Sequence, residues 1–370
     1  MNNYKPGTLF IVLSFIFTLL GLTQSVVLNL TDLSIHSDHN TLLLGGFLLA
    51  TVVYSCVSPI HFKHVLVTQL GTFISAYLLI HTGALFSPVP AFFWFYVLAV
   101  VLLANLSLKY LAELPDRQIP QLVMTALFGF WCLYVWQLSV TFLHVPQVLL
   151  PTPTAIAGAL ATHSAMLWGD FVQTVVKAVV AGYLLGNGLG IVTGILIERS
   201  PFLQRGFLPL ANLTSTIPLV GIAPIAVMWF GFDWPSKAAV IVLVTYFPAL
   251  VSTLAGLHST NKLEGELMYS YGANYWVTLK MLRLPAAMPF IFNALKVNSA
   301  LALITAIVAE YFGSPTVGLG FRISVEAARM HMPIVWSAIV VASVAGSLIY
   351  AVLVYLERRV TFWHPAIRKA

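Results

Sequence analysis

Apolar stretches of membrane-spanning length follow one another along this chain of 370 residues. A helix needs about 20 apolar residues to cross the hydrocarbon core of a bilayer. Hydrophobic residues make up 59% of the sequence and charged residues only 8%, whereas soluble domains carry about 25% charged residues. We therefore predict an all-α polytopic membrane protein with about ten transmembrane helices. The expected helices lie near residues 8–28, 41–58, 64–83, 89–108, 120–143, 171–197, 209–231, 236–257, 290–310 and 334–356.

The basic residues indicate how these helices are oriented, because cytoplasmic loops carry an excess of Lys and Arg. If the N-terminus faces the cytoplasm, most of the 18 basic residues fall on that side. The exceptions, toward the exterior, are Lys177, Lys237, Arg322 and Arg329. We expect both termini to be cytoplasmic, and the first apolar run to be a retained helix rather than a cleaved signal peptide. Basic residues so dispersed form no patch for nucleic acid.

The chain is expected to divide near residues 114–116. Residues 1–114 hold four helices without a motif that we recognise, and their role is open between lateral packing, assembly and lipid contact. Residues 115–370 hold six helices, interrupted by an exterior segment, 144–170, that contains three prolines. A short interfacial helix near 155–167 and a simple connecting loop are both compatible with that segment.

Metal ligation is not indicated by the sequence. The ten His residues show no metal-ligand spacing, and the two cysteines, Cys56 and Cys132, lie inside apolar runs without flanking ligands. We read both cysteines as small buried hydrophobic residues.

The segment 262–285 is polar and charged although it lies between two long apolar stretches. It reads as two short helices. Glu264 and Glu266 fall in a first turn, where the helix dipole favours anions. Gly272 can adopt the left-handed conformation that ends a helix, and Asn274 can cap the helix that follows.

The second of these short helices carries Tyr275, Leu279 and Leu282 on one stripe, and Leu284-Pro285 is expected to close it, because proline cannot continue the hydrogen-bond ladder. An alternative is an amphipathic helix pair lying on the membrane surface. Such helices are usually rich in Lys and Arg, whereas the charges here are nearly balanced.

The spacing within this segment is specific: Glu266, five residues, Gly272, nine residues, Leu282, one residue, then Leu284-Pro285. It resembles the EAA loop of ABC-importer permeases, the loop that grips the ATPase subunit. Two small residues usually follow the glutamate, and here they are Leu267 and Met268.

Further motifs occur in the same order as in one family. Residues 120–370 resemble the permease subunits of nitrate/sulfonate/taurine-type ABC importers, the binding-protein-dependent transport inner-membrane component family. The motifs that carry this resemblance are Leu150–Pro153, Gly190–Gly194, Pro218–Pro224, Trp229–Gly231, Val308–Glu310 and Gly318–Gly320.

The resemblance implies a permease core of six helices in a bacterial inner membrane, in a homodimer with the pathway between two copies. It also implies two cytoplasmic ATPase subunits and a solute-binding protein that docks outside, near 144–170 and 311–333. The loop residues implied in ATPase coupling are Glu264, Glu266, Tyr271, Gly272, Ala273, Leu282, Leu284 and Pro285.

The chain is not expected to be an enzyme or to bind a cofactor itself. It contains no Gly-x4-Gly-Lys-Ser/Thr phosphate loop, so ATP and Mg²⁺ are expected on the partner ATPase. The resemblance leaves the solute open among nitrate, sulfonates such as taurine, bicarbonate, pyrimidine precursors of thiamine and flavin-like vitamins.

A glycine series is a candidate for helix packing, and several residues in the predicted membrane helices are candidates for the substrate pathway. Gly182, Gly186, Gly190 and Gly194 recur every four residues on one helix face, which favours close helix packing over a ligand site. Prolines in transporter helices often mark a break that lines the pathway, although a plain kink is the alternative. The pathway candidates are Pro218, Pro224, Met228, Trp229, Asn298, Thr305 and Glu310.

Some of these candidates have a competing interpretation. Core packing is the alternative for Met228 and Trp229. A charge at the bilayer centre costs about 2.5–3.5 kcal/mol, so Glu310 is expected to be paired or to lie near the exterior interface. Asn298 and Thr305 would complete a polar lining with it.

Two other classes of protein remain as rivals. An ion-coupled secondary carrier would need ionisable pairs inside its helices, and Glu310 has no obvious cation partner in the sequence. A membrane-embedded enzyme would need clustered His, Asp or Glu, and none is visible.

Overall fold

The computed structural model describes residues 8–31, 39–57, 62–83, 91–113, 121–214, 218–313 and 317–363. In these ranges all regular secondary structure is helical, which confirms the all-α prediction. Among the described residues, seven helices are long and apolar enough to cross a membrane. Shorter apolar segments represent the predicted spans near 8–28, 41–58 and 209–231.

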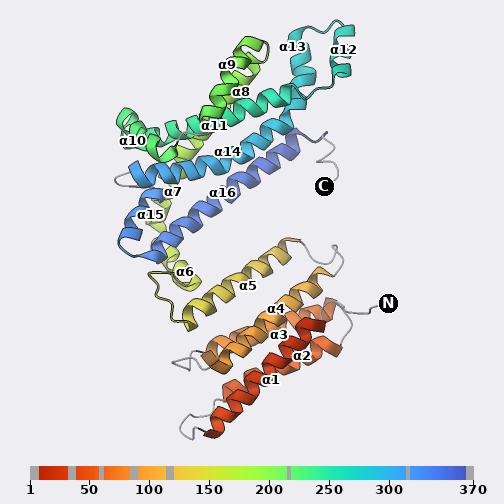
Figure 1. Cartoon of the computed structure of the whole chain (residues 1–370), viewed down its shortest axis with the longest axis vertical. Coiled ribbons are helices and arrows are strands. Elements are labelled where there is room, and N and C mark those ends of the chain that lie inside the picture. Colours follow the sequence, from red (N-terminus) through yellow and green to blue (C-terminus); the bar gives the residue numbers. More distant parts are fainter. Residues whose placement is uncertain are drawn as a thin grey trace. The chain divides into compact units, whose positions relative to one another are not determined.

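The chain forms two compact units, Met1–Pro153 and Thr154–Ala370 (Figure 1). In unit 1, α1 packs along α4 and α2 pairs with α3. Buried hydroxyls there are satisfied by backbone carbonyls, as when Thr72 Oγ1 donates to Thr68 O at 2.7 Å. The helices of unit 1 are α1 (Thr8–Thr31), α2 (His39–Val57), α3 (Phe62–Gly83), α4 (Ala91–Ala112) and α5 (Gln121–Phe142).

The boundary between the units differs from the predicted one after residue 114, because α5 packs against the N-terminal helices. The Trp131 ring stacks on Phe73 with ring centroids 5.3 Å apart, and Tyr134 Oη donates to Ala76 O at 2.7 Å. These contacts place α5 in unit 1. Cys132, the residue after Trp131, is exposed, so its prediction as a buried residue is wrong. The side chain of Cys56 lies outside the described residues.

In unit 2, α11 packs between α8 and α14. The first helices of this unit are α6 (Pro153–Thr162), α7 (Ser164–Phe171), η1 (Val172–Val179), α8 (Val180–Ile197), α9 (Pro201–Thr214), α10 (Leu219–Phe230) and α11 (Trp234–Leu257). They are followed by α12 (Lys262–Ser270), α13 (Tyr275–Thr278), η2 (Leu279–Arg283), α14 (Leu284–Gly313), α15 (Leu319–Ala328) and α16 (Met332–Val360). The π-helical segment η1 joins α7 and α8 into one continuous helix. In Figure 1, α12 and α13 lie at one end of this unit, and α6 and α15 lie at the opposite end.

The close approach of α8 and α11 depends on glycine. Gly182, Gly186, Gly190 and Gly194 are all buried on the face of α8 that contacts α11. A Cβ atom added at Gly182 would lie 2.8 Å from the carbonyl oxygen of Ala238. Backbone lies directly opposite, so a larger side chain has no space unless the helices separate.

The span predicted over 209–231 is interrupted near Pro218, which agrees with the break predicted from its prolines. The structure has two helices there, with α9 ending at Thr214 and α10 beginning after Pro218, whose ψ of 113° is extended. Proline disfavours helical geometry in the residue before it, and it lacks an N–H for the ladder. The short helix predicted near 155–167 is present as α6, although residues from Ser164 onward already belong to the next helix.

Candidate functional site

We call residues 262–283 the elbow: α12, a turn, α13 and η2. Its first helix begins with a capping box, in which Asn261 Oδ1 accepts from Leu263 N at 3.4 Å and Glu264 Oε2 accepts from Asn261 N at 3.3 Å. Gly272 ends this helix with a φ of +67°, a conformation that favours glycine. Asn274 then caps α13 by accepting from Val277 N at 3.0 Å. Local hydrogen bonds thus fix the turn where the sequence predicts it.

The elbow does not close at Leu284-Pro285, and this part of the prediction is wrong. The helix runs from Tyr275 through the π-helical segment η2 directly into α14. Because π-helical bonds span five residues, a widened turn accommodates the N–H that Pro285 lacks. The second half of the elbow is therefore continuous with a long membrane helix.

Large apolar side chains cover the outside of the elbow. No residue of α12 is buried, and Tyr269 and Tyr271 are 84% and 82% exposed. Trp276 and Met281 extend this surface onto α13 and η2. A hollow of about 460 Å³ opens between the two halves, lined partly by Glu266. Exposed apolar surface of this kind marks an interaction site.

The opposite face of the elbow is fixed to the rest of unit 2. Leu279 is 5% exposed and packs with Leu257 and Ala287. Tyr275 Oη donates to Glu198 Oε2 at 2.8 Å, and the Arg283 guanidinium pairs with the same carboxylate. The sequence analysis missed Glu198, which lies far from the elbow in the chain and has no local motif.

The pathway candidates separate into two groups. Asn298 and Thr305 are enclosed inside the chain, at 0% and 2% exposure. Asn298 Nδ2 donates to Asn187 Oδ1 at 2.6 Å and to Thr245 O at 2.9 Å, and so joins α14 to α8 and α11. This buried amide holds three helices together.

The exposed pathway candidates lie on or next to α10. Met228 and Trp229 are 83% and 77% exposed, so the alternative interpretation of core packing within the chain is wrong for both. Pro224 and Ile225, one turn earlier, are also exposed, whereas Ala223 and Ala226 are buried. Pro218, at the start of the helix, is exposed as well. The structure therefore gives α10 an uncovered apolar stripe.

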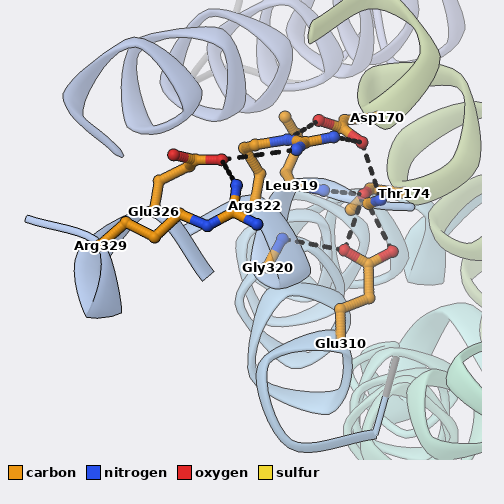
Figure 2. A network of polar contacts seen from close by, with 9 residues as sticks. Asp170, Thr174, Glu310, Leu319, Gly320, Arg322, Glu326 and Arg329 are labelled. Carbon is orange, nitrogen blue, oxygen red and sulfur yellow. Dashed lines mark hydrogen bonds and ion pairs between the residues drawn. The ribbon is translucent and has the colours of Figure 1, made fainter. Parts of the chain in front are cut away.

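Glu310 belongs to a buried network at the end of unit 2 opposite the elbow (Figure 2). Thr174 Oγ1 donates to the Glu310 carboxylate at 2.8 Å and accepts from Leu319 N at the same distance. Gly320 N donates to Glu310 Oε2 at 3.0 Å. At 1% exposure, Glu310 is enclosed by protein and is held by hydrogen bonds from Thr174 and Gly320.

A second acid completes this network. Asp170 is fully buried, accepts from Gly318 N at 2.9 Å and pairs with Arg322 Nε at 2.8 Å. Arg322 and Arg329 both contact Glu326 on α15 (Figure 2). The start of α15 is thereby tied to α7, η1 and α14.

Asp233 ties the turn before α11 to η1. Its Oδ1 accepts from Gln173 Nε2 at 2.6 Å and from Trp234 N at 2.8 Å. These two hydrogen bonds hold the pKa of the Asp233 carboxyl below its usual value.

Within the described residues, no group of three or more His, Cys, Asp or Glu side chains is arranged to hold a metal ion. Nor do the buried acids resemble an acid–base pair over a substrate cavity, since each already binds donors from the chain itself. The arrangement suits mechanical connection between helices better than chemistry.

Comparisons with known proteins find a matching family and several related transport permeases. A family model described as the binding-protein-dependent transport system inner membrane component matches residues 186–362, which include the elbow, α10 and Glu310. The formylaminopyrimidine transport permease protein ThiX of Halalkalibacterium halodurans is 32% identical over 243 residues, 66% of this chain and 96% of that protein.

Other relatives carry different solute names. The taurine transport system permease protein TauC of Escherichia coli is 30% identical over 64% of this chain and 86% of its own length. The riboflavin transport system permease protein RibX of Chloroflexus aurantiacus is 29% identical, over 63% and 87% respectively.

Proposed function

This chain belongs to the family of binding-protein-dependent transport system inner membrane components, the permeases of ABC transporters, and we propose that it is the membrane subunit of an ATP-driven importer. The solute passes through without covalent change. ATP and Mg²⁺ bind to separate ATPase subunits, which supply the energy.

The observation that carries this proposal is the elbow. Its outer face is apolar and aromatic, and Tyr269 is 84% exposed, yet its backbone is ordered by two caps and a glycine turn. Apolar surface on a pre-ordered segment binds a partner at a low entropy cost. We assign the ATPase to this face.

The orientation follows from the position of the elbow and from the basic residues. An ATPase works in the cytoplasm, so the elbow faces that side. Both termini then face the same side under the positive-inside rule, in a bacterial inner membrane.

The exposed stripe of α10 supports a second copy of the chain. Met228 and Trp229 are uncovered in one copy although they follow a proline break typical of transport pathways. In the homodimer, the two α10 stripes face one another and form the apolar wall of the pathway.

The opposite end of unit 2 receives the solute-binding protein. Within the predicted segments 144–170 and 311–333, residues 154–170 and 317–333 belong to this end of unit 2, and the Asp170–Arg322 pair ties them together. The solute belongs to the range named for the relatives, a small organic or anionic molecule such as a sulfonate or a vitamin precursor.

Reconstitution tests this function. The full chain is placed in proteoliposomes with and without its copurifying ATPase and a candidate solute-binding protein, and is offered radiolabelled taurine, riboflavin and formylaminopyrimidine. We expect uptake of one of these three solutes, and we expect that uptake to require ATP and all of the components. Uptake by the chain alone, driven by an ion gradient, would show a secondary carrier instead.

A further inference from the structure

Glu198, the residue that follows α8, meets the ends of three other segments. It is 8% exposed. Its Oε2 accepts from Tyr275 Oη at 2.8 Å, its Oε1 pairs with Arg283, and His258 Nε2, at the end of α11, lies 4.0 Å away. The Arg199 guanidinium covers the Tyr275 ring at 5.2 Å from its centroid.

Glu198 is not placed where a carboxylate stabilises its own helix. The C-terminus of a helix carries partial negative charge, so an acid there is unfavourable without a cation. The carbonyl groups at this helix end already have a donor, since Gln204 Nε2 donates to Glu198 O at 2.6 Å. An ionised carboxylate cannot donate to these carbonyl groups, and the side chain of Glu198 instead accepts from the elbow.

The two partners of Glu198 hold the elbow at two points. Tyr275, Leu279 and Arg283 recur every four residues and form its inner face. Tyr275 lies at the start of α13 and Arg283 at the end of η2, and both bind one carboxylate. A two-point attachment restricts both tilting and rotation of this segment about α14.

The attachment spans the segment of the elbow with the weakest helical geometry. η2 is π-helical, and such turns are rare and frequently functional points of irregularity within a helix. Without Glu198, a pull on the elbow can bend the chain at η2 and leave α8 in place. With Glu198, the same pull acts on α8, whose glycine face and Asn187 join it to α11 and α14.

We propose that Glu198 is the positioning residue that makes α8 move together with the elbow. This rests on the proposed function, in which an ATPase moves the elbow. Tyr275 and Arg283 are the two contacts through which Glu198 acts.

Pulsed electron paramagnetic resonance on the complete complex tests the proposal. Spin labels are placed at Leu267 on the elbow and Leu189 on α8, both exposed. In the otherwise native complex the distance between them should stay the same when ATP and vanadate trap the ATPase. In Glu198→Ala it should change by ~5 Å, one helical turn, or split into two distances.

Matched variants separate positioning from general stability. Glu357→Ala removes another partly buried ion pair, with Lys296 at 2.8 Å between α14 and α16, and should leave the distance unchanged. Exchanging the charges, Glu198→Arg with Arg283→Glu, should restore the native distance. If Glu198→Ala does not assemble, Tyr275→Phe removes one contact and should broaden the distribution.

An unchanged distance in Glu198→Ala and in Tyr275→Phe, with nucleotide trapping intact, would overturn the role of Glu198. So would a charge exchange that folds and hydrolyses ATP but leaves the distance altered. A native chain that copurifies no ATP-hydrolysing subunit would instead overturn the proposed function, whatever the variants do.

Discussion

Carboxylates buried in unit 2 bind donors that come from distant parts of the chain. Asp170 accepts a hydrogen bond from Gly318 N and pairs with Arg322. Glu310 accepts from Thr174, and Glu198 accepts from Tyr275. A buried charge is tolerated only where such partners compensate its desolvation. Each of these acids therefore acts as a tie between helices rather than as a free ligand.

Thr174 bridges Glu310 and the backbone N–H of Leu319 at the start of α15. Thr174→Val keeps the shape of the side chain but leaves Glu310 Oε1 and Leu319 N each without their hydrogen-bond partner, while Gly320 N still donates to Glu310 Oε2. Since a buried unsatisfied group costs about 1–3 kcal/mol, we expect a lower thermal unfolding temperature in detergent. Thr174→Ser keeps the hydroxyl and should stay close to the native temperature. Equal unfolding temperatures for the Thr174→Val variant and the native protein would mean that this bridge contributes nothing to stability.

Gly272 and Glu266 are the two residues at which we propose to test docking of the elbow. Proline fixes φ near −65°, whereas Gly272 has +67°, so Gly272→Pro breaks the turn. Glu266 is exposed, and Glu266→Lys reverses its charge on the docking face. Both variants should abolish uptake while the chain remains in the membrane, as measured by transport and immunoblotting of membranes. Gly265→Ala, where an added Cβ meets nothing within 4 Å, should transport normally. Normal uptake by both of the first two variants would remove the elbow from the mechanism.

At the scale of elements, the contact between α8 and α11 is sensitive to side-chain size. At Gly186 an added Cβ would run into the backbone of Val242 and the hydroxyl of Thr245, while at Gly188, on the same helix, it would meet nothing within 4 Å. The two glycines differ only in the face of α8 that they occupy.

Gly186→Leu should therefore separate α8 from α11 and destabilise the protein by about 3 kcal/mol or more. Gly188→Leu should be tolerated. Size-exclusion chromatography and thermal unfolding of the two purified variants check this difference. A Gly186→Leu protein as stable as the native one would mean that this face does not pack against α11.

The sequence predicts local elements better than contacts between them. The caps at Asn274 and the turn at Gly272 involve residues within a few positions, so their residue types suffice. The bonds of Glu198 to Tyr275 and Arg283 link distant positions that no spacing rule connects. Pro285 reads as a helix end, because the sequence does not reveal the π-helical turn that accommodates it.

The exposed stripe on α10 illustrates a second reason why the sequence does not predict contacts between elements. Apolar residues such as Met228 and Trp229 look the same in a sequence whether they face a core, lipid or another copy. Only the packing of Ala223 and Ala226 reveals which side of α10 is covered.

At the scale of the whole molecule, one helix connects the two functional ends of unit 2. α14 has 30 residues and begins at the elbow, and Glu310 in its last turn holds the opposite network. Its length of about 45 Å exceeds the hydrocarbon core of a bilayer. In the proposed importer, this helix carries motion of the elbow toward the network around Glu310, as alternating access by rigid-body tilting requires.

Cross-linking from the elbow in the working complex tests this account most directly. A photoreactive amino acid replaces Tyr269 on the elbow or Leu348 on α16, both exposed, in membranes that take up solute. Tyr269 should cross-link to an ATP-hydrolysing subunit and Leu348 should not. Adducts of Tyr269 only with lipid, with this chain itself or with a protein on the outer side would contradict the account.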